Sequence, residues 1–472
     1  MTNADDSFDV IVIGSGPGGY ICAIRAASLG LKTLIIEKEN VGGVCLNWGC
    51  IPTKALLRSA EIFNLVKGCD QYGIKASGVG FDFSRVIQRS REVVKKLNMG
   101  ISGLLKKQKV TVVLGTAEFS GAGAVDVTPS DGGKPKRYTA KNIVIATGAR
   151  PRVLSGLEPD GKQIWDYKAA LKPERLPDRI VILGAGAIGV EFASFYHAFG
   201  SKVTLMDLQS AILPLEDADV SRSVAQAFSA RGIDIRTGAM FVSCEKRRKT
   251  GDLEIVVMRD DKKEKIIADV VLVATGITAN TESLSLDKAG VEKDSSGHIV
   301  VDACCRTSAQ GVWAIGDVAS SPPWLAHKAA AEGSRVAEVI SGKHVTFPKP
   351  SEIPSCIYAS PQVASVGMTE KAVKELGIEC KIGKFPLSAS GKAIAMGEEY
   401  GFVKTIFDAH TGEILGAHMV GAEVTEIIHS YVIGRTLETT EVEFMQAVFP
   451  HPTVSEAVQE SVMAAWGRPL HV

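Results

Sequence analysis

The sequence predicts an α/β protein with two doubly wound domains built on parallel sheets, followed by a smaller α+β domain. A strand, a glycine-rich turn and a helix follow one another near the N-terminus, and the same pattern returns at Arg179. After residue 350, apolar and polar residues alternate in three segments, which is typical of an antiparallel sheet. A chain of 472 residues is long enough for several such domains.

The repeated pattern has the same parts in the same order in both copies. An apolar run, 8–13 in the first copy and 179–183 in the second, leads into the turn and then into residues at helical spacing. The next strand ends in an acid 23 positions after the first glycine, Glu37 in one copy and Asp207 in the other. The glycines that define the turns are Gly14, Gly16 and Gly19 in the first copy and Gly184, Gly186 and Gly189 in the second.

This order indicates two dinucleotide-binding sites of the Rossmann type. Glycines let the backbone approach a pyrophosphate, the N-terminus of the helix faces it with free N–H groups, and the acid receives ribose hydroxyls. One such turn would be weak evidence, but two complete copies are strong evidence. Each copy also closes with a strand and an Ala-Thr-Gly triplet, at residues 146–148 and 274–276, so the repeat has the size of a domain.

Two cysteines follow the first acid closely. Cys45 and Cys50 precede Pro52 and a run of good helix formers, so we expect Cys50 at a helix N-terminus, where a thiolate is stabilised. Lys54 lies four residues on, on the same helix face. The alternative is a pair of buried structural thiols beside a solvated lysine. A metal site is disfavoured, because no nearby Cys or His supplies further ligands.

The composition excludes several classes of protein. Lys plus Arg and Asp plus Glu are both 53, so no general attraction to nucleic acid or to an anionic membrane is expected. No apolar run reaches the roughly 18 residues of a membrane span. Residues 1–9 contain three Asp and resemble neither a secretory signal nor a transit segment. Nine cysteines are too sparse for a disulfide framework, so we expect a cytoplasmic protein.

The rest of the chain completes the predicted domains. A strand at 311–315 ends in Gly316-Asp317 and is followed by a helix over 325–341, which we expect to return to the first domain. Residues 120–137 are typical of a polar hairpin. Segments 364–366, 400–407 and 414–420 predict the antiparallel sheet, and 423–436 and 454–466 predict helices. The expected domains are 1–150, 151–280, 281–347 (completing the first) and 348–472.

His451 and Glu456 form a second polar constellation. Pro452 follows the histidine, and Thr453 precedes the glutamate by three residues at the start of a predicted helix. Glu456 fits two roles by its spacing. It could be the reciprocal partner of Thr453 in a capping box, or it could hold the imidazole of His451 in one tautomer and raise its basicity. The residues alone leave both open.

Taken together, the motifs resemble the class I pyridine nucleotide-disulphide oxidoreductases over essentially the whole chain. The segments that carry the resemblance are 14–19, 45–54, 146–148, 274–276, 316–317, 325–328, 451–453 and Glu456. Val44 stands where relatives commonly have Thr, and Asp207 where they more often have Glu.

The resemblance implies FAD at the first site and NAD at the second. It assigns to FAD the residues Gly14, Gly16, Gly19, Glu37, Lys54, Thr147, Gly148, Asp317 and Ala326. It assigns to NAD the residues Gly184, Gly186, Gly189, Asp207 and Gly276. Asp207 favours NAD on physical grounds too, because a carboxylate accepts ribose hydroxyls and repels a 2′-phosphate. The helix that begins near His327 is implied to face the flavin, with the histidine in a structural role.

Within the family, the resemblance is greatest to the enzymes that oxidise protein-bound dihydrolipoyl groups. It implies that the substrate thiol attacks Cys45, that Cys50 lies nearer the flavin, and that His451, held by Glu456, accepts protons. It also implies that Glu191 pairs with Lys54. From the sequence alone Glu191 would be an exposed helix glutamate.

The implied assembly is a homodimer in which His451 of one subunit lies over Cys45 of the other. Lipoyl-bearing proteins of 2-oxoacid dehydrogenase or glycine cleavage complexes are the implied partners. Alternatives within the enzyme class are glutathione, mercuric and thioredoxin reductases, although no cysteine follows Cys380 to supply the terminal motif of the last two. An alternative of a different class is a flavin-bearing structural or binding subunit whose main role is docking onto a multienzyme assembly. Cys304 and Cys305 are expected to be small packing residues.

Overall fold

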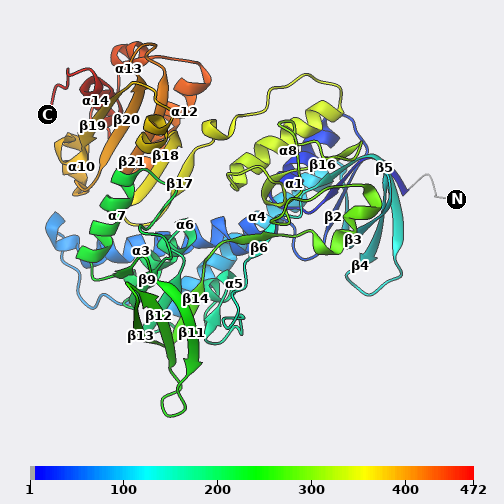
Figure 1. The fold of residues 1–472 in the computed structure, drawn as a ribbon, viewed down its shortest axis with the longest axis horizontal. Coiled ribbons are helices and arrows are strands. Elements are labelled where there is room, and N and C mark those ends of the chain that lie inside the picture. The colour runs from blue at the N-terminus through cyan, green and yellow to red at the C-terminus, as the bar shows by residue number, and fades with distance from the viewer. Residues whose placement is uncertain (1–5) are drawn as a thin grey trace. The chain divides into compact units, whose positions relative to one another are not determined.

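The computed structural model describes residues 6–472. Residues 1–5, part of the segment in which the sequence predicts no secretory signal, lie outside the described residues. The chain divides into two compact units, each made of several stretches of sequence (Figure 1). The first unit comprises the chain up to Ala55, Arg85–Arg152 and Gly276–Pro350, and the second comprises Leu56–Ser84, Val153–Thr275 and Ser351–Val472.

The first unit is built on a six-stranded sheet. Its strands are β1 (Ser7–Ile13), β2 (Thr33–Glu37), β3 (Thr111–Gly121), β4 (Ala124–Pro129), β5 (Lys136–Ile145) and β16 (Val312–Ala314). Strand β1 runs parallel to β2 and β5, β2 runs parallel to β3, and β16 runs parallel to β5. Strand β4 pairs antiparallel with β3 and β5, which confirms the hairpin excursion. Strand β1 contributes to apolar clusters on both faces of the sheet, as expected for a parallel strand.

Helices cover this sheet and extend from it. They are α1 (Pro17–Ser28), α2 (Gly43–Trp48), α3 (Cys50–Lys67, whose last twelve residues belong to the second unit), α4 (Phe83–Lys107), α8 (Ala326–Ile340) and the short 3₁₀ helices η3 (Glu282–Leu284), η4 (Leu286–Ala289) and η5 (Gly316–Val318). Helix α1 packs closely on α8, because a Cβ at Gly333 would clash with the carbonyl of Gly18. A small antiparallel pair, β6 (Ala149–Pro151) and β15 (Ile277–Ala279), completes the unit.

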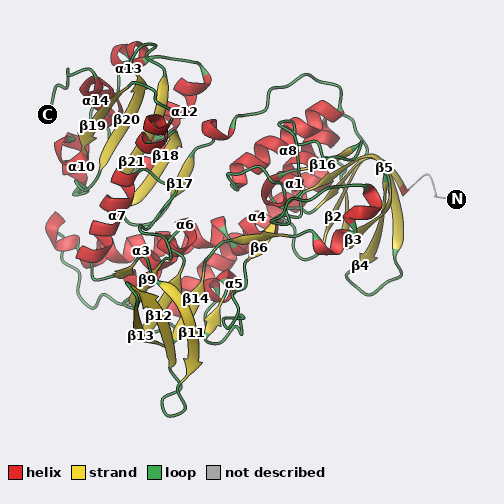
Figure 2. Ribbon diagram, in the orientation of Figure 1, coloured by secondary structure: helices red, strands yellow, loops and turns green. Residues whose placement is uncertain are grey.

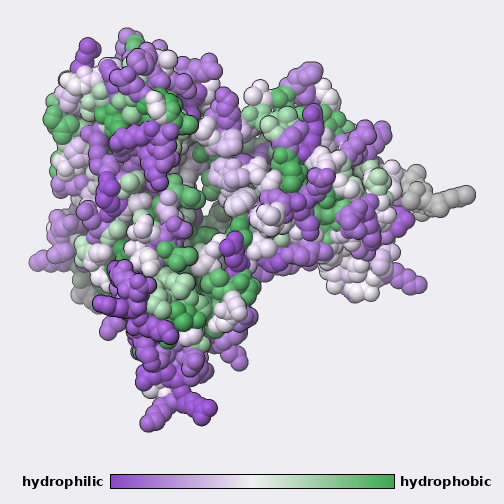
Figure 3. All heavy atoms as spheres, viewed as in Figure 1, coloured by the Kyte–Doolittle hydropathy of each residue, from purple (hydrophilic) through white to green (hydrophobic). Residues whose placement is uncertain are grey.

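The second unit repeats the parallel sheet. Its strands, in spatial order, are β10 (Asp234–Arg236), β9 (Lys202–Met206), β8 (Arg179–Leu183), β14 (Val270–Val273) and β7 (Ile164–Trp165). The helices of this half are α5 (Tyr167–Leu171), α6 (Ala187–Ala198) and α7 (Ala218–Ala230). An antiparallel meander follows, with β11 (Met240–Lys246), β12 (Leu253–Arg259) and β13 (Lys262–Ala268). The end of this meander has a hydrophilic surface (Figure 3).

The second unit also contains the predicted antiparallel sheet. Its strands, in spatial order, are β17 (Ser355–Ile357), β18 (Gln362–Gly367), β21 (Ile414–Gly421), β20 (Phe402–Asp408) and β19 (Cys380–Pro386). Its helices are α9 (Glu370–Glu375), α10 (Gly391–Met396), α11 (Val424–Ile427), α12 (His429–Thr436), α13 (Glu441–Gln446) and α14 (Glu456–Ala465), and α11, α12 and α14 pack on the sheet (Figure 2). Strands β20 and β21 are buried on both faces, so they lack the half-exposed alternation that the sequence suggested.

A buried lysine joins helix α7 to this antiparallel sheet. Lys404 of β20 is 2% exposed and its ammonium lies 2.9 Å from Asp217, 3.1 Å from Asp219 and 2.7 Å from Glu370. Burial opposes ionisation of Asp219, but the hydrogen bond and charge of Lys404 outweigh it and lower the pKa of the Asp219 carboxyl to about 2. This cluster is one of the contacts that join the second parallel sheet and the C-terminal sheet in one compact unit.

Residues 56–84 group with the second unit, although the expected first domain, 1–150, would contain them. The reason is an aromatic cluster between the end of α3, the loop after it and α6. The rings of Phe63 and Phe199 stack with their centres 5.5 Å apart, Phe81 contacts Phe199 at 4.9 Å, and Phe83 lies 6.2 Å from Phe195. Such pairings link segments far apart in sequence and cannot be inferred from local spacing. The domain boundaries themselves stay a prediction.

None of the helices within residues 6–472 combines the length and apolar character that crossing a membrane requires.

Candidate active site

The first glycine turn leaves open space over the start of helix α1. Gly14 has φ +101°, and a Cβ there would clash with the carbonyl of Ala146 in the neighbouring strand connection. Gly16 is the N-cap of α1, no side chain caps the helix, and a Cβ at Gly16 would meet nothing within 4 Å. The first N–H groups of α1 therefore face open space, as binding of a pyrophosphate requires.

The second turn reproduces this arrangement around helix α6. Gly184 has φ +102°, and a Cβ there would clash with the carbonyl of Ala274. Gly186 is the N-cap of α6, again without a side-chain cap, and a Cβ at this position would also meet nothing within 4 Å. The hydroxyl of Thr275 is buried without a hydrogen-bond partner among the described residues. Both turns therefore fit a nucleotide.

The two acids are held in equivalent ways. Glu37 accepts hydrogen bonds from the Ser15 N–H at 2.9 Å and the Ser15 hydroxyl at 2.6 Å, and it is 7% exposed. Asp207 accepts from the Ala185 N–H at 2.6 Å and from the Gln209 N–H at 2.8 Å. Each carboxylate thus connects the end of the second strand to the residue after the first glycine. Ser15 was not among the predicted site residues, although its hydroxyl inside the turn was a visible signal.

Asp317 lies in η5, just after β16, and close to a buried ion pair. Lys328 and Glu332 of α8 are 7% and 5% exposed, and Glu332 also accepts a hydrogen bond of 2.8 Å from the Gly316 N–H. Burial raises the pKa of the Asp317 carboxyl, and the nearby Lys328 ammonium partly offsets that rise. Neither Lys328 nor Glu332 was among the predicted site residues, although their spacing of four on one helix could have indicated the pair.

The predicted cysteine pair lies where two helices meet. Cys45 is in α2, and Cys50 begins α3, which agrees with the expectation of a helix N-terminus at Cys50. The two side chains are hydrogen-bonded thiols, and the pKa of Cys45 is raised first by that hydrogen bond and then by burial, with the charge of Lys54 opposing the rise. Cys50 lies at the positive end of α3, a position that stabilises a thiolate.

His451 and Glu456 form the pair that one interpretation of the sequence predicted, and Glu456 also bonds the backbone of Thr453. One carboxylate oxygen lies 2.9 Å from His451 Nδ1, and the other accepts from the Thr453 N–H at 2.9 Å. The reciprocal half of a capping box is missing, because the Thr453 hydroxyl donates to the Pro450 carbonyl. Burial opposes the ionisation of Glu456, but the bonds from Thr453 and His451 outweigh it and lower the pKa of the carboxyl. The histidine side chain is 79% exposed.

Glu191 differs from what the sequence alone indicated. It is not an exposed helix glutamate: it is 6% exposed and accepts a hydrogen bond of 2.9 Å from the Tyr358 N–H. That partner is 167 residues away in the chain, so local spacing could not reveal it. Cys45, Cys50 and Lys54 belong to the first unit, whereas Glu191, His451 and Glu456 belong to the second.

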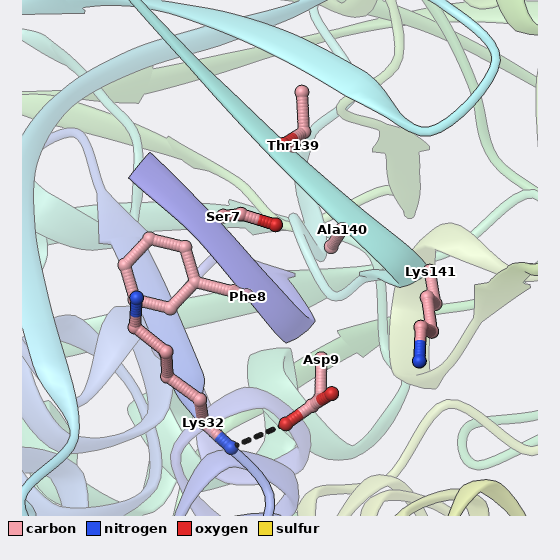
Figure 4. Close-up of a pocket in the computed structure, with 7 residues that line it drawn as sticks. All are labelled: Ser7, Phe8, Asp9, Lys32, Thr139, Ala140 and Lys141. Carbon is pink, nitrogen blue, oxygen red and sulfur yellow. Dashed lines mark hydrogen bonds between the residues drawn. The ribbon is translucent and has the colours of Figure 1, made fainter. Parts of the chain in front are cut away.

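A hollow of about 380 Å³ lies in the first unit, where strands β1 and β2 begin (Figure 4). The Lys32 N–H donates to Asp9 at 2.9 Å there, and the Lys32 ammonium lies 4.7 Å from the centre of the Phe8 ring. The residues that line it are Ser7, Phe8, Asp9, Lys32, Thr139, Ala140 and Lys141. Nucleotides bind at the carboxyl ends of parallel strands, so this hollow is separate from the predicted cofactor site.

The fold and the site define a class: a protein with two dinucleotide-binding halves and a dithiol beside the first of them. The comparison with protein families gives the class its name. Residues 8–333 match the pyridine nucleotide-disulphide oxidoreductase family, and residues 353–462 match the dimerisation domain of that family. The chain belongs to the pyridine nucleotide-disulphide oxidoreductases, which confirms the predicted fold class and the homodimer.

Individual relatives extend over the full length of the chain. It is 50% identical over 467 residues to the dihydrolipoyl dehydrogenase of Zymomonas mobilis, with 99% of both chains covered. It is 48% identical over 484 aligned positions to the dihydrolipoyl dehydrogenase of Rhizobium etli, again with 99% of both covered. The crystal structure of LpdA from Mycobacterium tuberculosis has a TM-score of 0.89 at 25% identity and covers 96% of this chain and 99% of its own.

Proposed function

We propose that this protein is a dihydrolipoyl dehydrogenase, which oxidises a protein-bound dihydrolipoyl group and reduces NAD⁺. The observation that carries the proposal is the hydrogen-bonded Cys45–Cys50 pair at the start of α3, within the segment that follows the first nucleotide turn. The overall reaction converts a dihydrolipoyl group and NAD⁺ into a lipoyl disulfide, NADH and a proton. Two electrons leave the substrate thiols and two arrive on the nicotinamide.

The cofactors are FAD and NAD, and the chain offers a fitting cradle for each. FAD would be held at the first turn by Gly14, Gly16, Gly19 and Glu37, together with Lys54, Thr147, Gly148, Asp317 and Ala326. NAD would be held at the second turn by Gly184, Gly186, Gly189, Asp207 and Gly276. Bound FAD supplies the chemistry that converts the electron pair of a dithiol into a hydride for NAD⁺.

The side chains of the protein carry out the thiol chemistry. A substrate thiolate attacks the sulfur of Cys45 in the Cys45–Cys50 disulfide, which forms a mixed disulfide and releases Cys50 as a thiolate. The second substrate thiol then displaces Cys45 and closes the lipoyl ring. His451, oriented through Nδ1 by Glu456, accepts the protons that the substrate thiols lose.

Lys54 and Glu191 complete the proposed catalytic set. Lys54 favours the thiolate form of the pair by its charge. The carboxylate of Glu191, held by the Tyr358 N–H, would balance that ammonium once the flavin is bound. In the homodimer, His451 would act on the Cys45 of the other subunit.

Asp207 favours NAD over NADP. Its carboxylate is fixed by the N–H groups of Ala185 and Gln209, so a 2′-phosphate would meet an immobile negative charge. A glutathione reductase would be better served by an NADP site, and the same residue therefore argues against that alternative. The lipoyl groups would be presented by partner proteins of a 2-oxoacid dehydrogenase or glycine cleavage complex. The sparse cysteines of the sequence fit a reducing compartment, and the cytoplasm is the location that we propose.

Anaerobic titration with dihydrolipoamide tests the proposal. The purified protein should develop a long-wavelength absorbance band on addition of dihydrolipoamide, and NADH should form when NAD⁺ follows. A flavin spectrum that does not respond to dihydrolipoamide, but changes with NADPH and lets glutathione disulfide be reduced, would overturn both the substrate and the nicotinamide assignment.

A further inference from the structure

A histidine that the proposed mechanism does not use is buried in the first unit. His298 is 3% exposed and ends a tight loop that begins at Asp294. Asp294 accepts hydrogen bonds from the backbone N–H groups of Ser296 and His298, at 2.8 and 3.0 Å, and from the Ser296 hydroxyl at 2.7 Å. The Ser296 oxygen in turn lies 2.8 Å from His298 Nδ1. The loop therefore fixes the imidazole ring from one side.

These contacts decide which nitrogen of His298 carries the proton. The only hydrogen of the Ser296 hydroxyl goes to the Asp294 carboxylate, whose pKa is lowered because the loop's hydrogen bonds outweigh the effect of burial. The Ser296 oxygen can therefore only accept from Nδ1, so Nδ1 is the donor. The neutral ring then has an unprotonated Nε2. That atom is buried and has no hydrogen-bond partner among the described residues.

The ring lies beside the part of the first unit that the cofactor would occupy. It stacks on Trp324, with ring centres 4.7 Å apart and an angle of 13° between the planes. Trp324 is fixed by a 3.0 Å hydrogen bond from its indole N–H to the Ala319 carbonyl, and it directly precedes Leu325, the N-cap of α8. His298 is also close enough to Asp317, an acid assigned to FAD, for a charge on the ring to affect that carboxyl. A buried acceptor without a donor costs about 1 to 3 kcal/mol, so a donor is expected when the site is filled.

We propose that His298 is a further cofactor-binding residue, whose Nε2 accepts a hydrogen bond from a hydroxyl group of the flavin nucleotide that Asp317 binds. This inference rests on the proposed function, since it requires FAD at the first glycine turn. The stack on Trp324 sets the plane of the imidazole, and the Asp294–Ser296 contacts set its tautomer. Neither contact uses the lone pair of Nε2, which is therefore available to accept a hydrogen bond from the ligand.

The test compares two substitutions of His298, each of which preserves a different property of the side chain. His298→Phe preserves a flat ring against Trp324 and removes the acceptor, whereas His298→Gln loses the ring and supplies an amide oxygen in its place. The measurement is the rate at which FAD leaves the purified holoenzyme after dilution. The rise in the fluorescence of free flavin reports this release. We expect the Phe variant to release FAD about tenfold faster, the effect of one lost hydrogen bond, and the Gln variant to recover most of the loss.

His344→Phe is the matched control, because His344 is exposed and lies in the same unit. It should release FAD at the rate of the unmodified protein. If the Phe variant retains FAD as well as the unmodified enzyme while the Gln variant loses it, His298 serves packing alone and the inference fails. If the unmodified protein itself purifies without FAD and does not bind it, the proposed function fails instead.

Discussion

The two nucleotide-binding halves share the same arrangement of strand, glycine turn, helix and acid, but the elements that pack around it differ. In each, an acid at the end of the second strand bonds the residue after the first glycine. In the first half, helix α8 packs on α1 and the buried Lys328–Glu332 pair lies beside Asp317. In the second, helix α7 is tied through Lys404 to the C-terminal sheet.

This difference in packing agrees with the different roles proposed for the two halves. In the proposed function FAD would be held in the first half by the N-terminus of α1, by α8 and by Asp317, as a cofactor that stays bound requires. At the second turn NAD⁺ would meet a half-exposed Asp207, whereas the equivalent acid of the first half, Glu37, is 7% exposed, and the more open acid suits a substrate that binds and leaves in each turnover. The dithiol lies in α2 and α3, in the connection that follows β2 of the first half.

The largest expected effect is that of removing one cysteine, which should abolish the redox chemistry and leave cofactor binding unchanged. Cys50→Ser is expected to lower dihydrolipoamide-dependent NADH formation by about 10⁴-fold, because no disulfide can form for the substrate to attack. FAD content, measured by absorbance, should not change. Cys69→Ser, a partly exposed cysteine of the second unit, should keep full activity. Substantial turnover by the Cys50 variant would show that another group is the electron acceptor.

The ion cluster around Lys404 should control the stability of the second unit. Lys404→Met leaves buried carboxylates without their cation and should lower the free energy of unfolding by about 3 kcal/mol at pH 7, measured by urea denaturation. Lys371→Met, at a side chain 82% exposed, should have little effect.

The effect of Lys404 should also depend on pH. The pKa of Asp219 is lowered from 3.8 to about 2 in the folded protein, so its stabilising contribution is complete above pH 3.8 and is lost as the pH falls through about 2. The difference in unfolding free energy between the unmodified protein and Lys404→Met should therefore shrink in that window. A difference that stays constant down to pH 2 would mean that the carboxylates do not carry it.

The two histidine–glutamate pairs of helix α14 give a matched comparison within the second unit. Glu456→Gln should lower kcat about 100-fold, because the amide cannot stabilise the positive imidazolium that forms when His451 accepts a proton. Glu460 binds His471 Nδ1 at 2.6 Å in the same manner one turn further along the helix. Glu460→Gln should leave kcat within about twofold. Equal losses in both variants would point to the helix and not to His451.

Matched glycine substitutions should test the contrast between the halves directly. A Cβ at Gly16 or Gly186 meets no protein atom within 4 Å, so each substitution acts on the nucleotide and spares the fold. Gly186→Val should raise the KM for NAD⁺ at least about tenfold with normal FAD content, and Gly16→Val should yield protein depleted of FAD. If Gly16→Val retained FAD and Gly186→Val lost it, the assignment of the two halves would be reversed.

Local spacing in the sequence determined the parts of the site that lie close together in the chain. The glycine turns, the acids Glu37 and Asp207, the start of α3 at Cys50 and the three central strands of the C-terminal sheet all follow from periodicity, turn residues and helix signals. The strand β17 and the helices α9, α10 and α13 were not predicted because each is brief, and the seven-residue strand β19 was not predicted because its pattern is weak.

Tertiary structure alone decided the features that depend on distant partners. Glu191 is buried because Tyr358 meets it from far along the chain, residues 56–84 join the second unit because Phe63 and Phe81 find Phe199, and His298 is buried by Trp324. Glu456 bonds both His451 and Thr453 because its two oxygens point to different neighbours. The physical reason is the same throughout: backbone conformation follows from adjacent residues, whereas burial and hydrogen-bond partners depend on which segments pack together.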